Sequence, residues 1–277
     1  MKDADVLKFK GRVMTLEKPV VMGILNVTPD SFSDGGKYAN IEAALEHAAR
    51  MLAEGATIID IGGESTRPGF KPVSEEEEAR RVIPAVREVR AAFPECVISV
   101  DTMKAGVAEA AVEAGADIVN DVSGLADPRM VDVVLGTGSG LVLMHGYREH
   151  TGAPRPATPG NLGRWMVNEI SALLEETVAR GVARESISLD PGFGFGKKME
   201  ENGELLKSMP ELVAACGRPV LIGGSRKHFV NGLHPEAGGD VVAASVRFAV
   251  DALRLGCKIF RVHDVVETCV ALGIALK

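Results

Sequence analysis

The sequence is poor in the features that mark secreted, membrane-spanning or nucleic-acid-binding proteins. Only four cysteines occur in 277 residues, and none has the Cys-x-x-Cys spacing of a zinc or redox motif. No apolar run approaches the about 18 residues of a membrane-spanning helix, and the charged N-terminus MKDADVLKFK lacks the apolar core of a signal peptide. The net charge of −7 gives no reason to expect nucleic acid as a partner. We therefore expect free thiols and a soluble cytoplasmic protein with no nucleic-acid partner and no membrane partner.

What the chain does contain is a recurring pattern in which an apolar strand gives way to a glycine-rich or charged loop. Seven such places read GILNVTPDSFSDGG at 23–36, IIDIGGESTRPG at 58–69, ISVDTMK at 98–104, DIVNDVSG at 117–124, ISLDPGFGFGK at 187–197, LIGGSRK at 221–227 and FRVHD at 260–264. Their mean spacing is roughly 34 residues, about one strand plus one helix of a (β/α)8 barrel. Polar residues gathered at the carboxyl ends of barrel strands predict an active site at that end.

The runs between these loops divide into strands and helices of the lengths that a barrel needs. The strands are mostly apolar, as expected where a parallel sheet is covered on both faces, and we predict them at 20–26, 57–61, 97–101, 117–121, 141–145, 186–190, 219–224 and 258–263. We predict helices at 41–54, 74–90, 104–113, 162–180, 203–216 and near 240–255. A hydrophobic content of 46% suits a sizeable core, and no linker divides the chain. The predicted fold class is α/β, a single (β/α)8 TIM barrel.

The motifs NVTPDSFSDGG, GGESTRPG, LDPGFGFGK and SRK occur together, in this order, between about Val21 and Val265. In this combination the chain resembles the dihydropteroate synthase family. The resemblance implies a transferase of folate biosynthesis that joins 4-aminobenzoate to 6-hydroxymethyl-7,8-dihydropterin diphosphate and releases pyrophosphate. It also implies one pterin-binding barrel domain over residues 1–277, Mg2+ as cofactor, a homodimer and a sulfonamide target.

The edge of a pterin ring offers N–H donors beside a carbonyl acceptor, so its site needs carboxylate or amide acceptors and a cationic donor. Asp101, Asn120 and Asp190 end three predicted strands, and Lys227 follows the seventh. Taken singly, Asp101 or Asp190 could instead be a helix N-cap. The resemblance assigns these four residues to the pterin and adds Met144 and Arg261, and the glycine-rich loop at 192–198 adds Phe195 as a further pterin-binding candidate.

A diphosphate leaving group needs positive charge and N–H donors as negative charge builds on it. Arg261 and His263 alternate on the last strand, so both point to one face, and Thr66 with Arg67 follows the second strand. The resemblance places His263 on the phosphate and Asn26 on the magnesium ion. Asp60 either supports that site or is a structural residue at a strand end. The predicted catalytic residues are Asn26, Lys227, Arg261 and His263.

Two long loops, 27–39 and 62–72, contribute the aminobenzoate pocket in the family. Phe32 and Pro68 would form its apolar wall. Ser225, Lys227 and His228 would face the carboxylate, together with the start of the following helix. The chain departs from the family pattern at 146–149 and at His228, which leaves these edges of the site open.

Three alternatives accompany this reading. GFGFGKK at 192–198 resembles a phosphate loop, but its spacing is short and Lys198 stands where Ser or Thr would bind magnesium, so a tight loop that brings Phe193 or Phe195 to a ring fits better. A methyltetrahydrofolate methyltransferase has a related fold but would not need the SRK and RVHD groups. A pterin-binding paralogue without turnover is the third alternative.

Overall fold

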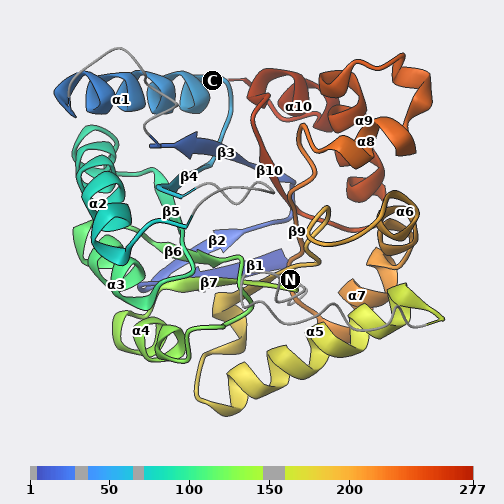
Figure 1. Cartoon of the computed structure of the whole chain (residues 1–277), viewed down its shortest axis with the longest axis horizontal. Helices are drawn as coiled ribbons and strands as arrows, with labels where there is room; N and C mark the ends of the chain where they lie inside the picture. Colours follow the sequence, from blue (N-terminus) through green and yellow to red (C-terminus); the bar gives the residue numbers. More distant parts are fainter. Residues whose placement is uncertain (1–4, 29–36, 65–71, 146–159, 277) are drawn as a thin grey trace.

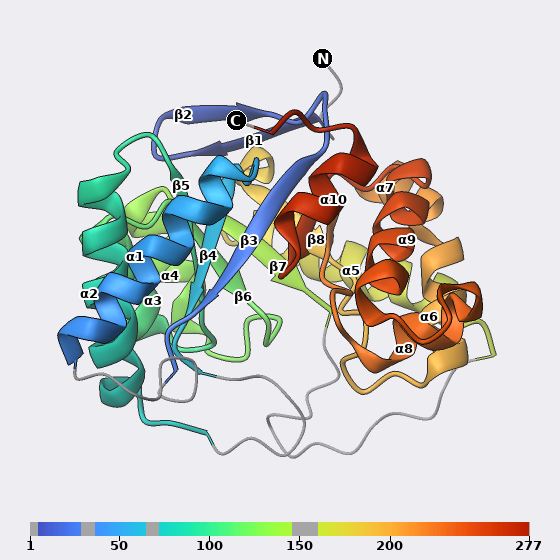
Figure 2. The same cartoon turned by 90° about the horizontal axis from the view of Figure 1, so that it is seen from above.

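Eight parallel strands form a ring surrounded by helices (Figures 1 and 2). The computed structural model describes residues 5–28, 37–64, 72–145 and 160–276. The strands are β3 (Val20–Asn26), β4 (Ile58–Gly62), β5 (Val97–Asp101), β6 (Ile118–Asp121), β7 (Gly140–Met144), β8 (Ile187–Asp190), β9 (Leu221–Ile222) and β10 (Ile259–Val262). Their order in the sheet is β8-β7-β6-β5-β4-β3-β10-β9, and a parallel bridge between Leu189 and Val220 joins its two ends. The predicted (β/α)8 barrel is confirmed.

One or two helices follow each strand from β3 to β10 along the chain, and they cover the outside of the ring (Figure 1). They are α1 (Lys37–Ala53), α2 (Glu75–Ala92), α3 (Ala105–Ala114), α4 (Arg129–Thr137), α5 (Leu162–Ala179), α6 (Met199–Lys207), α7 (Met209–Cys216), α8 (His228–Leu233), α9 (Val241–Arg254) and α10 (Val265–Leu272). Helix α2 begins where predicted, because the Ser74 side chain accepts from the Glu77 N–H and four glutamates occupy the first turn. No helix among the described residues is long and apolar enough to cross a membrane.

Alternation along the strands divides the core into two layers. Side chains that point outward, such as Ile59, Ile98 and Phe260, pack with the helices in one large cluster. Their neighbours Ile58, Val97 and Ile259 point inward and belong to a second, smaller cluster inside the ring. This inner cluster lies at the amino ends of the strands, so the barrel interior is apolar at one end and polar at the other.

A hairpin that the sequence analysis did not predict closes the apolar end. Strands β1 (Val6–Phe9) and β2 (Arg12–Thr15) pair antiparallel and lie across the ring (Figure 2). Leu7, Phe9 and the nearby Leu16 are buried and complete the inner cluster. Arg218, fully buried, ties the hairpin to the barrel by donating to the carbonyls of Val6, Ile187 and Glu185 at 2.7, 2.9 and 3.0 Å.

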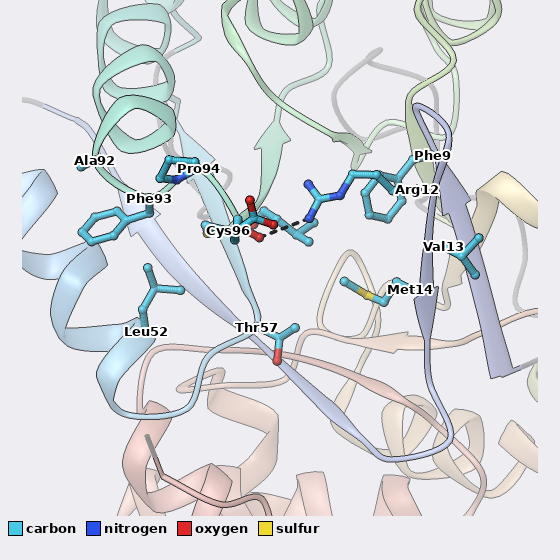
Figure 3. Close-up of a pocket in the computed structure, with 12 residues that line it drawn as sticks. Phe9, Arg12, Val13, Met14, Leu52, Thr57, Ala92, Phe93, Pro94 and Cys96 are labelled. Carbon is cyan, nitrogen blue, oxygen red and sulfur yellow. Dashed lines mark hydrogen bonds between the residues drawn. The ribbon is translucent and has the colours of Figure 1, made fainter.

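A hollow of about 580 Å³ lies beside this hairpin, between β2, the end of α2 and the start of β5 (Figure 3). Arg12 extends from the hairpin across it and donates to the Glu95 carbonyl at 3.2 Å. The other lining groups are mainly apolar, among them Phe9, Met14 and Phe93. The hollow therefore lies at the end of the barrel opposite the predicted active site.

Two predicted elements differ from the structure, each for a local reason. The helix predicted at 203–216 is two helices, because Pro210 lies in the first turn of α7 and the chain is interrupted at Ser208. The strand predicted at 219–224 pairs only at Val220 and over β9, since Gly223 and Gly224 leave the sheet. Helix α4 was not predicted. The four cysteines are free and buried.

Candidate active site at the carboxyl ends of the strands

The carboxyl ends of the strands bring most of the predicted ligand residues to one place. The last inward-facing positions of six strands hold Asn26, Asp101, Asn120, Met144, Asp190 and Arg261. The sheet register pairs Asp101 with Asn120 and Met144 with Asp190, so neighbouring strands present these groups side by side. Asn120 and Met144 are almost fully buried, and both aspartates are more than nine-tenths buried. A polar floor thus covers the apolar interior.

Arg261 is the central cation of this floor. Its Nε donates to Oδ2 of Asp60 at 2.5 Å, and a terminal nitrogen donates to Oδ2 of Asp101 at 2.5 Å. Burial acts to lower the pKa of the guanidinium, but the carboxylates of Asp60 and Asp101 outweigh it and hold the pKa of Arg261 above its usual value. Arg261 therefore remains charged and joins strands β4, β5 and β10.

Asp60 holds two of the predicted groups, Arg261 and Asn120, by hydrogen bonds. It is fully buried, and besides Arg261 it accepts from the side-chain nitrogen of Asn120 at 3.3 and 3.4 Å. Asp60 therefore supports Arg261 and Asn120, whereas its predicted support of the site at Asn26 stays a prediction. The side-chain oxygen of Asn120 is buried and has no hydrogen-bond partner among the described residues. An acceptor left in this way beside a cation is available to a ligand donor.

Burial disfavours the ionised form of two carboxyl groups in the floor, those of Asp101 and Asp190. Burial raises the pKa of Asp101, while Arg261 opposes the shift and Asp60 adds to it. Burial likewise raises the pKa of Asp190, opposed by the Gly192 N–H, which donates to its Oδ1 at 2.7 Å. Carboxyl pKa values raised in this way cluster at functional sites.

Lys227 reaches the same floor from the loop after β9. Its Nζ donates to the Phe193 carbonyl at 2.5 Å and lies 4.1 Å from the centre of the Phe195 ring. Burial lowers the pKa of Lys227 to about 8, and Asp190 opposes this shift. Phe195, partly buried, is therefore the ring that lies at the site, whereas Phe193 is buried in the core against Phe229 and Phe248.

Ser225 and His263 form a second group of polar side chains beside Arg261. The Ser225 hydroxyl accepts from the His263 backbone N–H at 3.2 Å and lies 3.1 Å from its Nδ1, so it fixes the orientation of the ring. His228, the first residue of α8, is exposed, and α8 has only six residues. The predicted contribution of a helix N-terminus is therefore small.

Asn26 ends β3 next to Gly62 of β4, to which it is paired. A Cβ atom at Gly62 would lie 3.4 Å from Cβ of Asp101 and 3.8 Å from Oδ1 of Asn26, so the glycine leaves room between these side chains. Among the described residues no cluster of three or more His, Cys, Asp or Glu could hold a metal ion. One amide oxygen at a strand end fits magnesium, which takes few protein ligands and fills its shell with water and phosphate oxygens.

Other residues near the site had no signal in the sequence analysis. Lys104, after β5, forms ion pairs with Glu64, after β4, and with Glu78, which is buried in α2. These partners are 40 and 26 residues from Lys104, so no local spacing could predict them. Burial raises the pKa of Glu78, with Lys104 opposing it. The cluster fixes the ends of two strands relative to each other.

Some predicted groups lie outside the described residues. They are Thr66 and Arg67 for the diphosphate, Phe32 and Pro68 for the aminobenzoate, and the departures from the family pattern at 146–149. Their roles stay predictions.

Comparison with known proteins agrees with the resemblance seen in the motifs. The profile of the family described as "Pterin binding enzyme" matches residues 22–263. A dihydropteroate synthase of Streptococcus pyogenes is 42% identical over 92% of this chain and 94% of its own length. A probable bifunctional folylpolyglutamate synthase/dihydropteroate synthase of Haloferax volcanii is 43% identical over 92% of this chain, which spans 30% of that protein.

A solved structure of dihydropteroate synthase from Xanthomonas albilineans with 4-aminobenzoic acid superposes with a TM-score of 0.88. It is 41% identical, and the alignment covers 98% of this chain and 97% of that one. The agreement therefore extends over the barrel as a whole and includes the strand ends that carry the polar floor. The chain belongs to the pterin-binding enzyme family and, within it, to the dihydropteroate synthases.

Proposed function

We propose that the chain condenses 6-hydroxymethyl-7,8-dihydropterin diphosphate with 4-aminobenzoate, giving 7,8-dihydropteroate and pyrophosphate. The observation that carries this proposal is the polar floor of the barrel. Asn120 presents a buried oxygen without a partner among the described residues, with Asp101 beside it on β5, Asp190 two strands away on β8, and the cations of Arg261 and Lys227 at the same end of the barrel. Acceptors next to a fixed cation match a pterin edge, which has N–H donors next to a carbonyl.

Each group of the floor has a part in holding the pterin. Asp190 and the oxygen of Asn120 accept from the ring N–H and amino groups, and the Lys227 ammonium donates to the carbonyl. Arg261, held in place by Asp60 and Asp101, lies against the ring face. The side chain of Met144 and the ring of Phe195 bound the pocket with apolar surface. The floor is rigid because strand ends, rather than loops, carry most of it.

The same reading assigns the leaving group to the neighbouring basic groups. As the C–O bond breaks, negative charge builds on the diphosphate, and Arg261 and His263 stabilise it, together with the predicted groups Thr66 and Arg67. Ser225 orients the His263 ring for this contact. Asn26 would hold the magnesium ion, which when bound neutralises phosphate charge. The attacking aromatic amine is already neutral, so no general base is assigned and catalysis rests on positioning and on stabilising the leaving group.

The aminobenzoate would bind above the pterin. Its carboxylate would contact Ser225, Lys227 and His228, which lie together in the loop between β9 and α8. Phe32 and Pro68 complete the predicted pocket. By the same resemblance we propose sulfonamides as ligands of this pocket, and a cytoplasmic homodimer as the working form.

The test is the release of pyrophosphate when the purified protein is mixed with the pterin diphosphate, 4-aminobenzoate and MgCl2. We expect release that depends on all three additions and stops in excess EDTA, with 7,8-dihydropteroate as the second product. Pterin binding without release would instead indicate the paralogue without turnover. Methyl transfer from methyltetrahydrofolate would indicate the methyltransferase, whose chemistry does not call on His263 or Ser225. Turnover undiminished in EDTA would remove the metal role from Asn26.

A further inference from the structure

The loop between β8 and α6, residues 191–198, forms a cradle for Lys227. The Phe193 carbonyl accepts from its Nζ at 2.5 Å, and the Phe195 ring lies beneath the same atom at 4.1 Å. Between them, Gly194 has a φ of +77°, and a Cβ there would lie 2.8 Å from Cδ of Lys227. Three consecutive residues of the loop therefore define where the Lys227 side chain can lie.

Asn202, in α6, holds this cradle from behind. Its side chain is fully buried and accepts from the Gly194 N–H at 2.8 Å. Its amide nitrogen donates to the carbonyls of Lys197 and Lys198 at 3.3 and 2.7 Å. All three of these bonds go to the backbone of one loop. The side chain thus links α6 to the segment against which Lys227 lies.

Lys197 closes the loop on its other side. Its ammonium group is buried and donates to the carbonyls of Gly192, Phe195 and His145 at 2.8, 3.3 and 3.4 Å. The first two are in the loop, and the third is at the end of β7. Gly192 makes this possible, because a Cβ there would lie 2.0 Å from the His145 carbonyl oxygen. One cation therefore folds the loop and joins it to the neighbouring strand end.

From this geometry we propose that Asn202 and Lys197 are positioning residues, which act on the pterin and aminobenzoate only through the cradle of Phe193, Gly194 and Phe195 that places Lys227. Neither residue carries a role in the proposed reaction. The inference rests on the proposed function in one respect, namely that Lys227 contacts the bound pterin and aminobenzoate. The sequence predicts a tight loop at GFGFGK, and the structure shows that Asn202 and Lys197 hold this loop beside Lys227.

The cradle also shapes the electrostatics of Lys227. The charged groups that act on its ammonium are the carboxylates of Asp190 and Asp101, which favour its charge, and Arg261, which opposes it. Burial outweighs all of them and lowers the pKa of Lys227 to about 8. If the loop loosens, water reaches the ammonium group and this pKa should rise.

The test compares Asn202→Ala and Lys197→Met with Lys197→Arg, which keeps donors at that position, and with Thr137→Ala. Thr137 lies at the end of α4, where its hydroxyl bonds to the Val133 carbonyl at 2.7 Å and to Ser139, so its loss removes only hydrogen bonds that lie away from the loop. For each variant we would measure the melting temperature, the Kd for 6-hydroxymethylpterin, and the Lys227 titration by NMR of 13C-labelled lysine, assigned with Lys227→Arg.

In Asn202→Ala and Lys197→Met we expect pterin affinity to fall about tenfold, the loss of roughly one well-placed hydrogen bond to a charged group. The Lys227 titration should move upward from about 8. Lys197→Arg should retain most of the affinity, and Thr137→Ala should lower only the melting temperature. In a Lys227→Arg background, Asn202→Ala should cost little further affinity.

Lowered melting temperatures with an unchanged Lys227 titration and unchanged pterin affinity would overturn the proposal, because Asn202 and Lys197 would then be structural only. The NMR titration needs no turnover. If the titration moves but no dihydropteroate forms, the positioning role stands and the proposed function fails. If dihydropteroate forms and the Lys227 titration does not move, the proposed function stands and the positioning role fails.

Discussion

Basic side chains bridge elements at both ends of the barrel, but their partners differ. At the amino end, Arg218, Lys10 and Arg90 donate mostly to backbone carbonyls, which ties the hairpin and the helix ends to the strands. At the carboxyl end, Arg261 and Lys227 lie among carboxyl groups on strand ends. Close to them the buried oxygen of Asn120 has no partner among the described residues.

The cations at the amino end serve the stability of the fold, whereas those at the carboxyl end serve ligand binding. A buried cation whose donors all find carbonyls contributes to the free energy of unfolding and has no donor to spare for a ligand. A floor that keeps an acceptor unpaired and carboxyl pKa values raised is less stable than it could be, and a ligand with the complementary donors and acceptors recovers that energy. Substitutions at matched positions should therefore affect stability at one end and catalysis at the other.

The largest contrast should come from Arg218 and Arg261, one at each end of the barrel. Arg261→Met should lower kcat/KM by at least about a thousandfold, because a cation beside developing charge is worth about 4 kcal/mol. Arg218→Met should leave kcat/KM unchanged and lower the free energy of unfolding by roughly 3 kcal/mol, since three buried carbonyls lose a charged donor. Urea unfolding with steady-state kinetics measures both. Equal losses of activity in the two variants would erase the contrast.

The next contrast concerns two buried aspartates. Asp190→Asn should weaken binding of a pterin by about 2–5 kcal/mol, because an amide presents a donor where the ring also has one. Asp117→Asn, at the amino end, should leave that affinity unchanged but destabilise the fold, because Asp117 accepts from Arg90 at 2.5 Å and from the Ile98 N–H at 3.0 Å. Titration calorimetry measures the pterin affinity of both variants, and scanning calorimetry measures their stability. An unchanged pterin affinity in Asp190→Asn would take Asp190 out of the site.

A smaller effect should follow pH at the carboxyl end. With a pKa of about 8, Lys227 loses its charge as pH rises through 8, so kcat/KM should fall there, and Lys227→Arg should remove this limb because arginine does not titrate. The folded chain binds fewer protons at Lys227 than the unfolded chain between pH 8 and 10.5, so its contribution to stability rises across that window. A wild-type profile flat to pH 10 would contradict the assignment.

The smallest effect is expected at Lys10, in the hairpin. Its Nζ donates to the carbonyls of Val112 and Ala116, both at 3.2 Å, at the end of α3. Lys10→Met should lower the free energy of unfolding by about 1 kcal/mol, because two partly exposed hydrogen bonds are lost. Turnover and pterin affinity should stay at the wild-type level. A change in either would mean that the hairpin communicates with the site.

Much of the fold followed from the sequence because its signals are local. Apolar runs that end in glycine or charge located the barrel strands and, with them, Asp101, Asn120 and Asp190 at one end. The hairpin and α4 were missed because they lie outside the motifs that set the period. The break at Ser208 was missed because Pro210 was not weighed against the helical pattern. Phe195 was predicted at the pterin, but Phe193 stayed open as an alternative, since the sequence of a loop does not fix which ring faces inward.

By itself the sequence determined the family, the barrel and the residues that end its strands, because periodicity and motifs are properties of neighbouring residues. Only the tertiary structure decided how those residues pair. Asp60 meets Arg261 across 201 residues of chain and Asn120 across 60, and Asn202 reaches Gly194 from the next helix. Such contacts exist only once the ring has closed, since closure sets which strand ends are adjacent, which charges are buried and which acceptor is left for a ligand.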